Sequence, residues 1–470
     1  MKVRTWTLMS CLLFSAGAWG AQFGPRTEAE MSASGAEAAP AANARVVEGA
    51  SPIVYTGPKF AVVIPVFDPG LPADTREYEK NGIWPELRRA EAVRGAVRLQ
   101  EELQKKGVFA SVAVMPDTTA SADLYVLGEI AESNGEDYQL NIEIYDATGS
   151  NWMRKKKFKH RVSEGWFRDP ATAGLDPYSP IYPMISNVII EQLVKEGKKH
   201  QRIEDRNEAL RAKGKGNKAK MTDLQRVVAT REVVFGRSVA PDLYGDAASF
   251  DKNGKAKLNY LPADDDPNWQ RIEAVMVADG RFNELVSLNY REFAERMEQP
   301  YTVWQRDAYP LAREYREAKT RANTQAVLGV LGALAGAAAA ASSNNGTTQA
   351  VGAAAAVAGA AAIATSFKTR AESKEQAAQL DELGQSVQSV VTPMRIEMQS
   401  RQIELKGTAA EQVAEWRSLL REIYNDTEMD PGAITVVQLN PPVTESSQPG
   451  STATEVPGEG ATAAPNIEPI

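Results

Sequence analysis

The side chains that most often carry catalysis or bind metals are scarce in this sequence. The 470 residues include two histidines, His160 and His200, and one cysteine, Cys11. Histidine-based catalysis and multi-histidine metal sites need more than this pair, and a thiolate metal site needs several cysteines. The composition therefore argues against these classes of active site.

Carboxylates are plentiful, and two short acidic segments could in principle bind a cation. Asp264, Asp265 and Asp266 are consecutive, and the segment from Asp251 to Gly254 has a faint similarity to the start of a calcium loop. Neither segment has the full ligand spacing of an EF-hand. We interpret both as surface turns and expect neither a bound metal nor a cofactor.

Sequence motifs of the common enzyme classes are also missing. The chain has no phosphate-binding loop, no G-x-S-x-G, no H-E-x-x-H and no Rossmann glycine fingerprint. A glycosidase that uses carboxylates alone stays compatible with the sequence, although no acidic pair stands out in an apolar setting. We expect a protein that is not an enzyme.

The beginning of the chain has the pattern of a signal peptide, which we assign to residues 1–20. Lys2 and Arg4 precede an uncharged, mostly apolar stretch from Trp6 to Trp19, which is too short to span a bilayer. Small residues at Ala18 and Gly20 predict cleavage before Ala21. The alternative is a lipoprotein whose lipid is attached to Cys11. Both alternatives predict export, to the periplasm or to the periplasmic face of the outer membrane.

Cleavage after residue 20 would make the mature chain more acidic. It removes two positive charges and takes the formal net charge from −8 to −10. Such a balance argues against general affinity for nucleic acid. Residues 21–53 are rich in small and polar residues and predict a flexible tether.

Residues 54–196 have the pattern of a small α/β domain. The continuous apolar run at 60–67 predicts a strand that is covered on both faces. Further strands are predicted at 108–114, 124–130, 138–144 and 152–162, and helices at 85–106 and 181–194.

Three segments of this domain resemble a known family. They are the strand ending in Pro65-Val66-Phe67, the run from Ala122 to Ile130, and the strand ending Tyr145-Asp146-Ala147-Thr148-Gly149. This order is similar to the amino-terminal domain of TolB and to the curli secretion lipoprotein CsgG. The resemblance covers about 140 residues. It implies a periplasmic assembly or docking module without catalytic residues, and partners among other envelope proteins.

Residues 197–220 and 221–324 follow as a basic linker and a mainly helical region. From Lys195 to Lys220 there are ten Lys or Arg residues against four acidic residues. No aromatic residues interleave these charges, so we favour a solvated helix end and a linker over a nucleic-acid-binding arm. Tyr301, Trp304, Tyr309 and Tyr315 are expected to form a buried helical seam.

Residues 325–367 carry the hypothesis about function. Two uncharged arms rich in Ala and Gly flank a polar turn, and each arm would be a helix about as long as the hydrocarbon core is thick. Small residues at three-, four- and seven-residue spacings permit close helix packing: Gly329, Gly332, Gly336, Gly352 and Gly359. The segment resembles the glycine-zipper hairpins of bacterial outer-membrane lipoproteins, which implies self-association and a possible outer-membrane association.

The remainder of the chain predicts a helix, a short extended segment and a terminal helix over 368–430, then a disordered acidic tail over 431–470. The expected fold class is α+β, with a long antiparallel helical hairpin within 270–391. Two functions stay open. One is a non-enzymatic envelope protein that acts in assembly or as an oligomeric membrane-associated component. The other is a soluble periplasmic scaffold or binding module with an intramolecular helical clasp.

Overall fold

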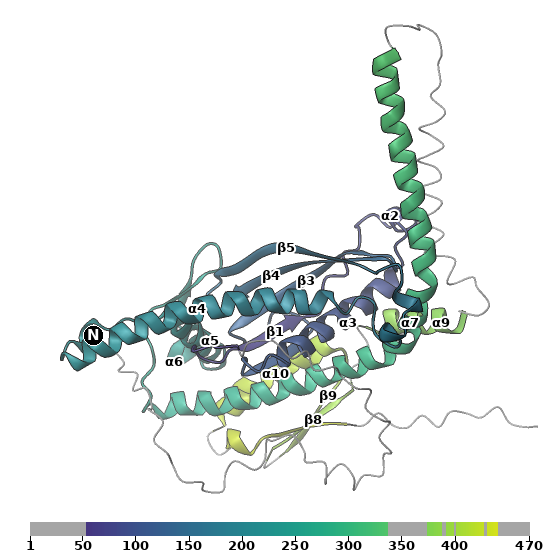
Figure 1. Cartoon of the computed structure of the whole chain (residues 1–470). Helices are drawn as coiled ribbons and strands as arrows, with labels where there is room; N and C mark the ends of the chain where they lie inside the picture. Colours follow the sequence, from purple (N-terminus) through teal and green to yellow (C-terminus); the bar gives the residue numbers. More distant parts are fainter. Residues whose placement is uncertain (1–52, 337–373, 388–391, 399–400, 427–429, 440–470) are drawn as a thin grey trace, which may run out of the picture.

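The computed structural model describes residues 53–336, 374–387, 392–398, 401–426 and 430–439. Its centre is a five-stranded sheet with strand order β2-β1-β3-β4-β5 (Figure 1). The strands are β1 (Ala61–Pro65), β2 (Ser111–Met115), β3 (Leu124–Ser133), β4 (Asp137–Asp146) and β5 (Asn151–Arg161). β1 pairs in parallel with β2 and β3, whereas β3, β4 and β5 form an antiparallel meander. The strands expected in the α/β domain are confirmed.

Hydrophobic patterning explains where each strand lies. Val62, Val63 and Ile64 of β1 are all buried, because this central strand is covered on both faces. In β4, buried Tyr138, Leu140, Ile142 and Ile144 alternate with half-exposed residues, as in a strand with one solvated face.

Helices α3 (Pro85–Gln104) and α4 (Ile181–Ala212) pack on this sheet and on each other. α3 begins with Pro85 at its first turn, and Gly107 follows its end with a φ of 67°. The short helix α2 (Arg76–Lys80) lies in the connection before α3. Both expected helices of the domain are thus present.

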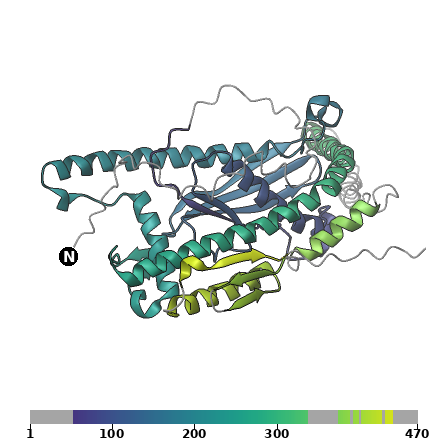
Figure 2. The same cartoon turned by 90° about the horizontal axis from the view of Figure 1, so that it is seen from below.

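The expected helix end in 197–220 is present and runs further than predicted, so the basic linker is shorter than expected. α4 continues to Ala212 and extends beyond the sheet (Figures 1 and 2). Lys, Arg and Glu are good helix formers, so a charged composition does not end a helix. The buried Asn207 side chain then bonds the backbone N–H and C=O of Lys220, which fixes the returning chain.

The next region is mainly helical, as expected, with one small hairpin. It contains α5 (Asp223–Val239), α6 (Pro241–Tyr244), β6 (Ala248–Phe250), β7 (Ala256–Leu258) and the 70-residue α7 (Pro267–Gly336). α7 follows the body and then bends and projects away from it (Figure 1). Pro300 and Pro310 lie within this helix, and proline removes a backbone hydrogen bond and bends helices.

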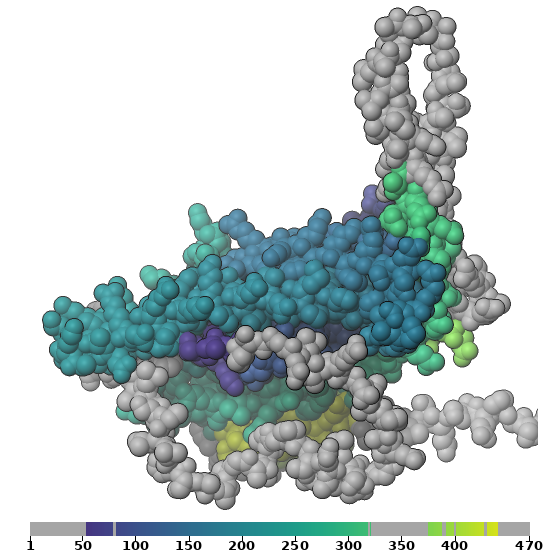
Figure 3. All heavy atoms as spheres, in the orientation of Figure 1, coloured from purple at the N-terminus to yellow at the C-terminus, as the bar shows by residue number. Residues whose placement is uncertain are grey.

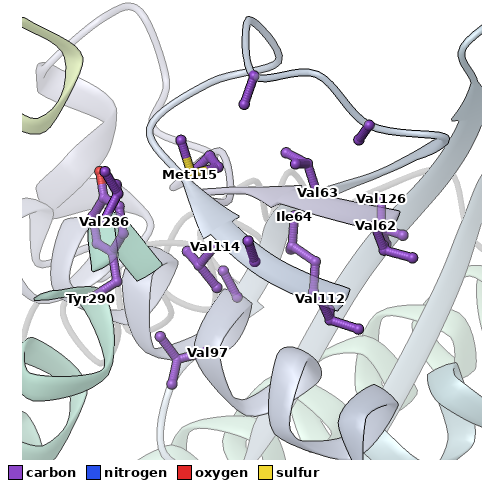
Figure 4. Close-up of a cluster of buried hydrophobic side chains, with 14 of the residues drawn as sticks. Val62, Val63, Ile64, Val97, Val112, Val114, Met115, Val126, Val286 and Tyr290 are labelled. Atoms are coloured by element: carbon purple, nitrogen blue, oxygen red, sulfur yellow. The ribbon is translucent and has the colours of Figure 1, made fainter. Parts of the chain in front are cut away.

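Apolar side chains of α7 pack at the β2 edge of the sheet. Val286 and Tyr290 face Val114 and Met115 (Figure 4). Further along α7, Tyr301 and Trp304 are buried and stack with their ring centres 5.3 Å apart. Tyr309 is also buried, whereas Tyr315 is only partly buried, so three of the four aromatic residues form the expected seam.

The carboxyl-terminal part forms α9 (Lys374–Ser386), β8 (Met394–Glu397), β9 (Gln402–Leu405), α10 (Ala409–Asn425) and β10 (Thr435–Gln438). The expected helix, extended segment and terminal helix are confirmed. The tail expected to be disordered from 431 is wrong for its first residues. A 3₁₀ turn, η6 (Pro431–Ala433), leads into β10, which pairs with β8, and Ile434 is buried.

The fold class is α+β, as expected. A long helical hairpin is not confirmed, because the second arm, with Gly352 and Gly359, lies outside the described residues. The signal segment and nearly all of the tether also lie outside them.

Candidate functional site

A row of polar side chains on α7 faces the interior of the molecule. Asp279, Asn283, Ser287 and Arg291 follow each other at four-residue spacing, which places them on one side of a helix. The first three are 6%, 8% and 1% exposed. An inward helix face is ordinarily apolar, so this row needs partners on the elements opposite.

One residue of the row, Ser287, acts with Gln100 of α3 to hydrogen-bond the edge of β2 that has no neighbouring strand. Ser287 Oγ accepts a hydrogen bond from the Val114 N–H at 2.9 Å. Gln100 of α3 donates through Nε2 to the Val112 carbonyl and to Ser287 Oγ, both at 2.7 Å. Two helices therefore supply side-chain partners to an edge strand that would otherwise expose unpaired backbone groups.

A cavity of about 500 Å³ lies beside this edge. The beginnings of β1 and β2 line it together with the end of α3, Arg231 of α5 and the polar row of α7. Its volume falls in the range of small-molecule sites, about 300–1,000 Å³. Polar groups are frequent in its wall: Gln100, Ser111, Arg231, Asp279, Asn283, Ser287 and Arg291.

One end of the polar row is held by a buried network. Trp416 of α10 donates through Nε1 to Asp279 Oδ1 at 3.0 Å, and Asn283 donates to Asp279 Oδ2 at 3.2 Å. Burial raises the pKa of Asp279, and these two donors and nearby arginines oppose that shift. The Phe282 ring stacks on Trp416 at 4.8 Å, so α10 fixes this part of α7.

Three buried polar atoms of the cavity wall have no hydrogen-bond partner among the described residues. They are Gln100 Oε1, Arg231 Nε and Arg291 Nε. Arg231 is balanced in part by Asp123, whose Oδ2 lies 3.4 Å from its Nη1. An orphaned buried donor or acceptor costs about 1–3 kcal/mol, so these three atoms lower the stability of this part of the structure.

A second, smaller cavity of about 290 Å³ lies against the polar face of β3, β4 and β5. Glu129 forms an ion pair with Lys155 there and accepts a hydrogen bond from Asn141 at 3.4 Å. These polar groups pair with one another, and none of the buried unpaired atoms among the described residues belongs to the wall of this cavity.

A buried cluster of charges lies on the other side of α3. Glu91 accepts hydrogen bonds from Ser133 at 2.5 Å and from Tyr301 at 2.8 Å. Arg94 pairs with Asp176 and Glu298, both at 3.0 Å. Neither cavity is lined by these residues, so we assign them to the attachment of α7 and not to a binding site.

The residues singled out in the sequence lie elsewhere. Gly329, Gly332 and Gly336 belong to the end of α7, and Gly352 and Gly359 fall outside the described residues. His160 is on β5 and His200 on α4, and burial lowers the pKa of both.

The two acidic segments are turns, as expected. Asp251 Oδ1 accepts the N–H groups of Asn253 and Lys255, and Asp266 Oδ1 accepts that of Asn268 at the start of α7. Within the described part of the chain, no three His, Cys, Asp or Glu side chains gather as a metal site would require.

The polar row was missed in the sequence, although its four-residue spacing is visible there. The apolar face of this helix includes Ile272, Val275 and Phe282, which are buried. A search for regularly spaced polar residues beside that face would have found the row.

Comparisons with known proteins provide no assignment. No family model, no curated protein and no solved structure matches the chain. Among the helices of the described residues, none has the length and apolar character that crossing a membrane requires.

Proposed function

We propose that this chain is an exported, non-enzymatic protein of the cell envelope. In this proposal it acts in assembly, or as an oligomeric membrane-associated component, through residues 325–367. The observation that carries the proposal is the course of α7, whose last part, with Gly329, Gly332 and Gly336, projects away from the body (Figure 1). Figure 3 shows in green where α7 leaves the body.

Because α7 is helical up to Gly336, the spacing of its glycines determines which side of the helix they occupy. Steps of three and four residues place Gly329, Gly332 and Gly336 on one side of a helix. Residues 321–336 add about 24 Å of rise. Glycine lets a second helix approach closely, which is the packing that glycine zippers use.

The helix that follows residues 337–373 packs on the same body as α7. α9 packs against both α3 and α7. Trp84 Nε1, just before α3, donates to Asp381 of α9 at 2.6 Å, and Gly384 of α9 lies directly against the Glu86 backbone. α7, which precedes residues 337–373, and α9, which follows them, therefore both pack on the same α/β body.

Features of the sequence support the envelope as the location. The pattern at residues 1–20 is that of an export signal, and the α/β region resembles the TolB amino-terminal domain and CsgG. That resemblance favours docking and assembly with other envelope proteins over catalysis.

A soluble periplasmic scaffold or binding module is the second candidate. The cavity of about 500 Å³ favours it, because its volume falls in the range of small-molecule sites. In this case residues 325–367 would be an intramolecular clasp.

Fractionation of the full-length protein, expressed in a bacterial host with an outer membrane, tests the proposal. We expect the protein in the membrane fraction after a carbonate wash, and an oligomer by sedimentation in mild detergent. Complete release by carbonate together with a monomeric mass would contradict it and favour the clasp. Amino-terminal sequencing of the same sample distinguishes cleavage before Ala21 from lipidation of Cys11, and an intact Met1 in the cytoplasm would refute export.

A further inference from the structure

We propose that the edge strand β5 and the base of the projecting part of α7 form a basic surface that binds the anionic headgroups of a membrane. The surface would lie against the membrane with which residues 325–367 are proposed to associate, so the inference rests on that proposed function. β5 is the last strand of the sheet, and one of its edges has no neighbouring strand.

β5 is a strongly basic strand, with six Lys or Arg residues and no acidic residue among its eleven residues. All six basic residues are exposed: Arg154, Lys155, Lys156, Lys157, Lys159 and Arg161. Carboxylates of β3 and β4 pair with Lys155, Lys159 and Arg161. Arg154, Lys156 and Lys157 form no ion pair among the described residues, so their charges can attract anions outside the molecule.

The basic strand leads to the base of the projecting part of α7. Arg313 of α7 pairs with Glu164 at 2.7 Å, and Arg316 pairs with Glu136 at 2.8 Å. Glu164 follows the end of β5, and Glu136 lies in the turn before β4. β5 runs along the side of the body from which α7 projects (Figure 1). A membrane that received the end of α7 would therefore face β5.

The uncharged segment 325–367 begins close to the level of this surface. α7 rises about 14 Å between Arg316 and Gln325. Headgroups extend about 5–7 Å outside the hydrocarbon core, and a charge acts over a Debye length of about 8 Å at physiological salt. The long side chains of β5 can therefore reach the headgroups. Basic residues also flank the segment on both sides in the sequence: Lys319, Arg321, Lys368 and Arg370.

Protection of an edge strand does not account for all of these charges. Lysine on an edge strand prevents pairing with another chain, and so do irregularities in the strand. The pairing of β5 with β4 is already interrupted on both sides of Ile144. Lysine also has a compact, hydrated charge, which suits a diffuse anionic surface better than bidentate recognition of single carboxylates. The formal net charge of −8 does not oppose local binding, because distant exposed charges are screened.

Co-sedimentation of the full-length protein with lipid vesicles tests the proposal. One kind of vesicle consists of phosphatidylcholine, and the other of phosphatidylglycerol and phosphatidylcholine in equal parts. We expect stronger binding to the anionic vesicles, and loss of this preference at high salt. Equal binding to both kinds of vesicle, or binding to neither, would overturn the proposal. Equal binding to both kinds together with binding of soluble polyglutamate would indicate an acidic protein as the partner.

Two double variants remove the same charge from different places. Lys156→Gln with Lys157→Gln should weaken binding to the anionic vesicles about tenfold or more. Lys213→Gln with Lys215→Gln, near the end of α4, should leave this binding unchanged, because α4 extends away from the projecting part of α7 (Figure 1). Equal weakening by the two double variants would show general electrostatic attraction and overturn the proposal.

A third variant separates loss of charge from loss of structure. Lys156→Arg with Lys157→Arg keeps both charges and should bind the anionic vesicles as the wild type does. Loss of binding in this variant would overturn the proposal, because anionic headgroups attract either cation. Thermal unfolding of all variants verifies that they fold.

A carbonate wash of the same vesicles distinguishes this surface from the role of residues 325–367. Protein that resists carbonate on both kinds of vesicle, with no effect of the β5 substitutions, would overturn the basic surface and leave the proposed function standing. Complete release by carbonate of a protein that binds anionic vesicles through β5 would support the basic surface and contradict the proposed function.

Discussion

Arg94 Nη1 lies 3.0 Å from Asp176 Oδ2, and both side chains are almost completely buried. Arg94 belongs to α3 and Asp176 to the segment before α4, so the pair joins α3 to the connection that leads into α4. The same guanidinium lies 4.5 Å from the centre of the Tyr301 ring and pairs with Glu298, both on α7. One buried cation therefore fixes the long helix to the sheet domain.

Replacing Arg94 should destabilise the whole body. Arg94→Met leaves Asp176 buried without its partner, which costs about 3–5 kcal/mol. Denaturant unfolding measures the loss. Arg89→Met on the same helix is the control, because its partner Glu86 is 3.7 Å away and Arg89 is 41% exposed. The control should change stability by less than about 1 kcal/mol. Equal effects of the two variants would contradict the role given to Arg94.

Glu91 should make the protein less stable as the pH rises. Burial raises the pKa of Glu91 above 4.5, the usual value of a glutamate, although Arg88 and the hydrogen bonds from Ser133 and Tyr301 act in the opposite direction. Folding therefore favours the neutral carboxyl, and its stabilising effect is lost as the pH rises above 4.5. We expect Glu91→Gln to gain stability relative to the wild type between acid and neutral pH.

Glu411 offers a control for the pH dependence of stability, because its contribution should change with pH in the opposite direction. Hydrogen bonds from Thr408 lower the pKa of Glu411 in the capping box of α10. Its stabilising effect is present above the unfolded pKa and lost as the pH falls through the lower folded value. Glu411→Gln should therefore lose stability relative to the wild type as the pH rises. Parallel pH profiles for the two variants would refute this assignment.

Two glycines should respond oppositely to alanine. A Cβ at Gly128 of β3 would overlap the Phe67 ring, so Gly128→Ala should cost about 1–3 kcal/mol. A Cβ at Gly280 of α7 would meet no atom within 4 Å, so Gly280→Ala should stabilise the protein by about 0.5–1 kcal/mol. Thermal unfolding of both variants measures the difference. A destabilised Gly280→Ala variant would contradict the open space that the structure has beside Gly280.

The attachment of α9 should depend on Gly384. A Cβ there would overlap the Glu86 backbone, so Gly384→Ala should separate α9 from the start of α3. Amide hydrogen exchange over 374–386 should then become faster than in the wild type. Gly216→Ala is the control, because its added Cβ would have its nearest contact at 3.5 Å. Unchanged exchange in Gly384→Ala would mean that α9 is held by other contacts.

The glycines of 325–367 should control self-association. Leucine at Gly332, Gly336 and Gly359 adds apolar area but holds helix backbones apart. We expect loss of the oligomer without loss of membrane affinity, measured by sedimentation and membrane fractionation. Val327→Leu and Val330→Leu together add bulk at positions that are not three or four residues from an α7 glycine, and this variant should keep the oligomer. A destabilised or aggregated monomer in place of a dispersed membrane protein would instead favour the intramolecular clasp.

The sequence by itself determined the local elements of this fold. The apolar run at β1, the alternation in β4 and the spaced apolar residues of α3 and α10 report which side of each element is buried. Each such signal arises from neighbours along the chain. The α+β class and the absence of a recognisable catalytic motif could therefore be stated before the structure was known.

Tertiary structure alone decided which elements meet. Asp279 bonds Trp416 across 137 residues, and Gln100 bonds Ser287 across 187. No local pattern encodes these distances, so the cavity was not predicted. The ordered structure of residues 431–439 was not predicted for the same reason. A short strand such as β10 is unstable alone and is stabilised here by pairing with β8 and by the burial of Ile434. Periodicity identifies the buried face of an element, whereas long-range packing selects the partner that covers it.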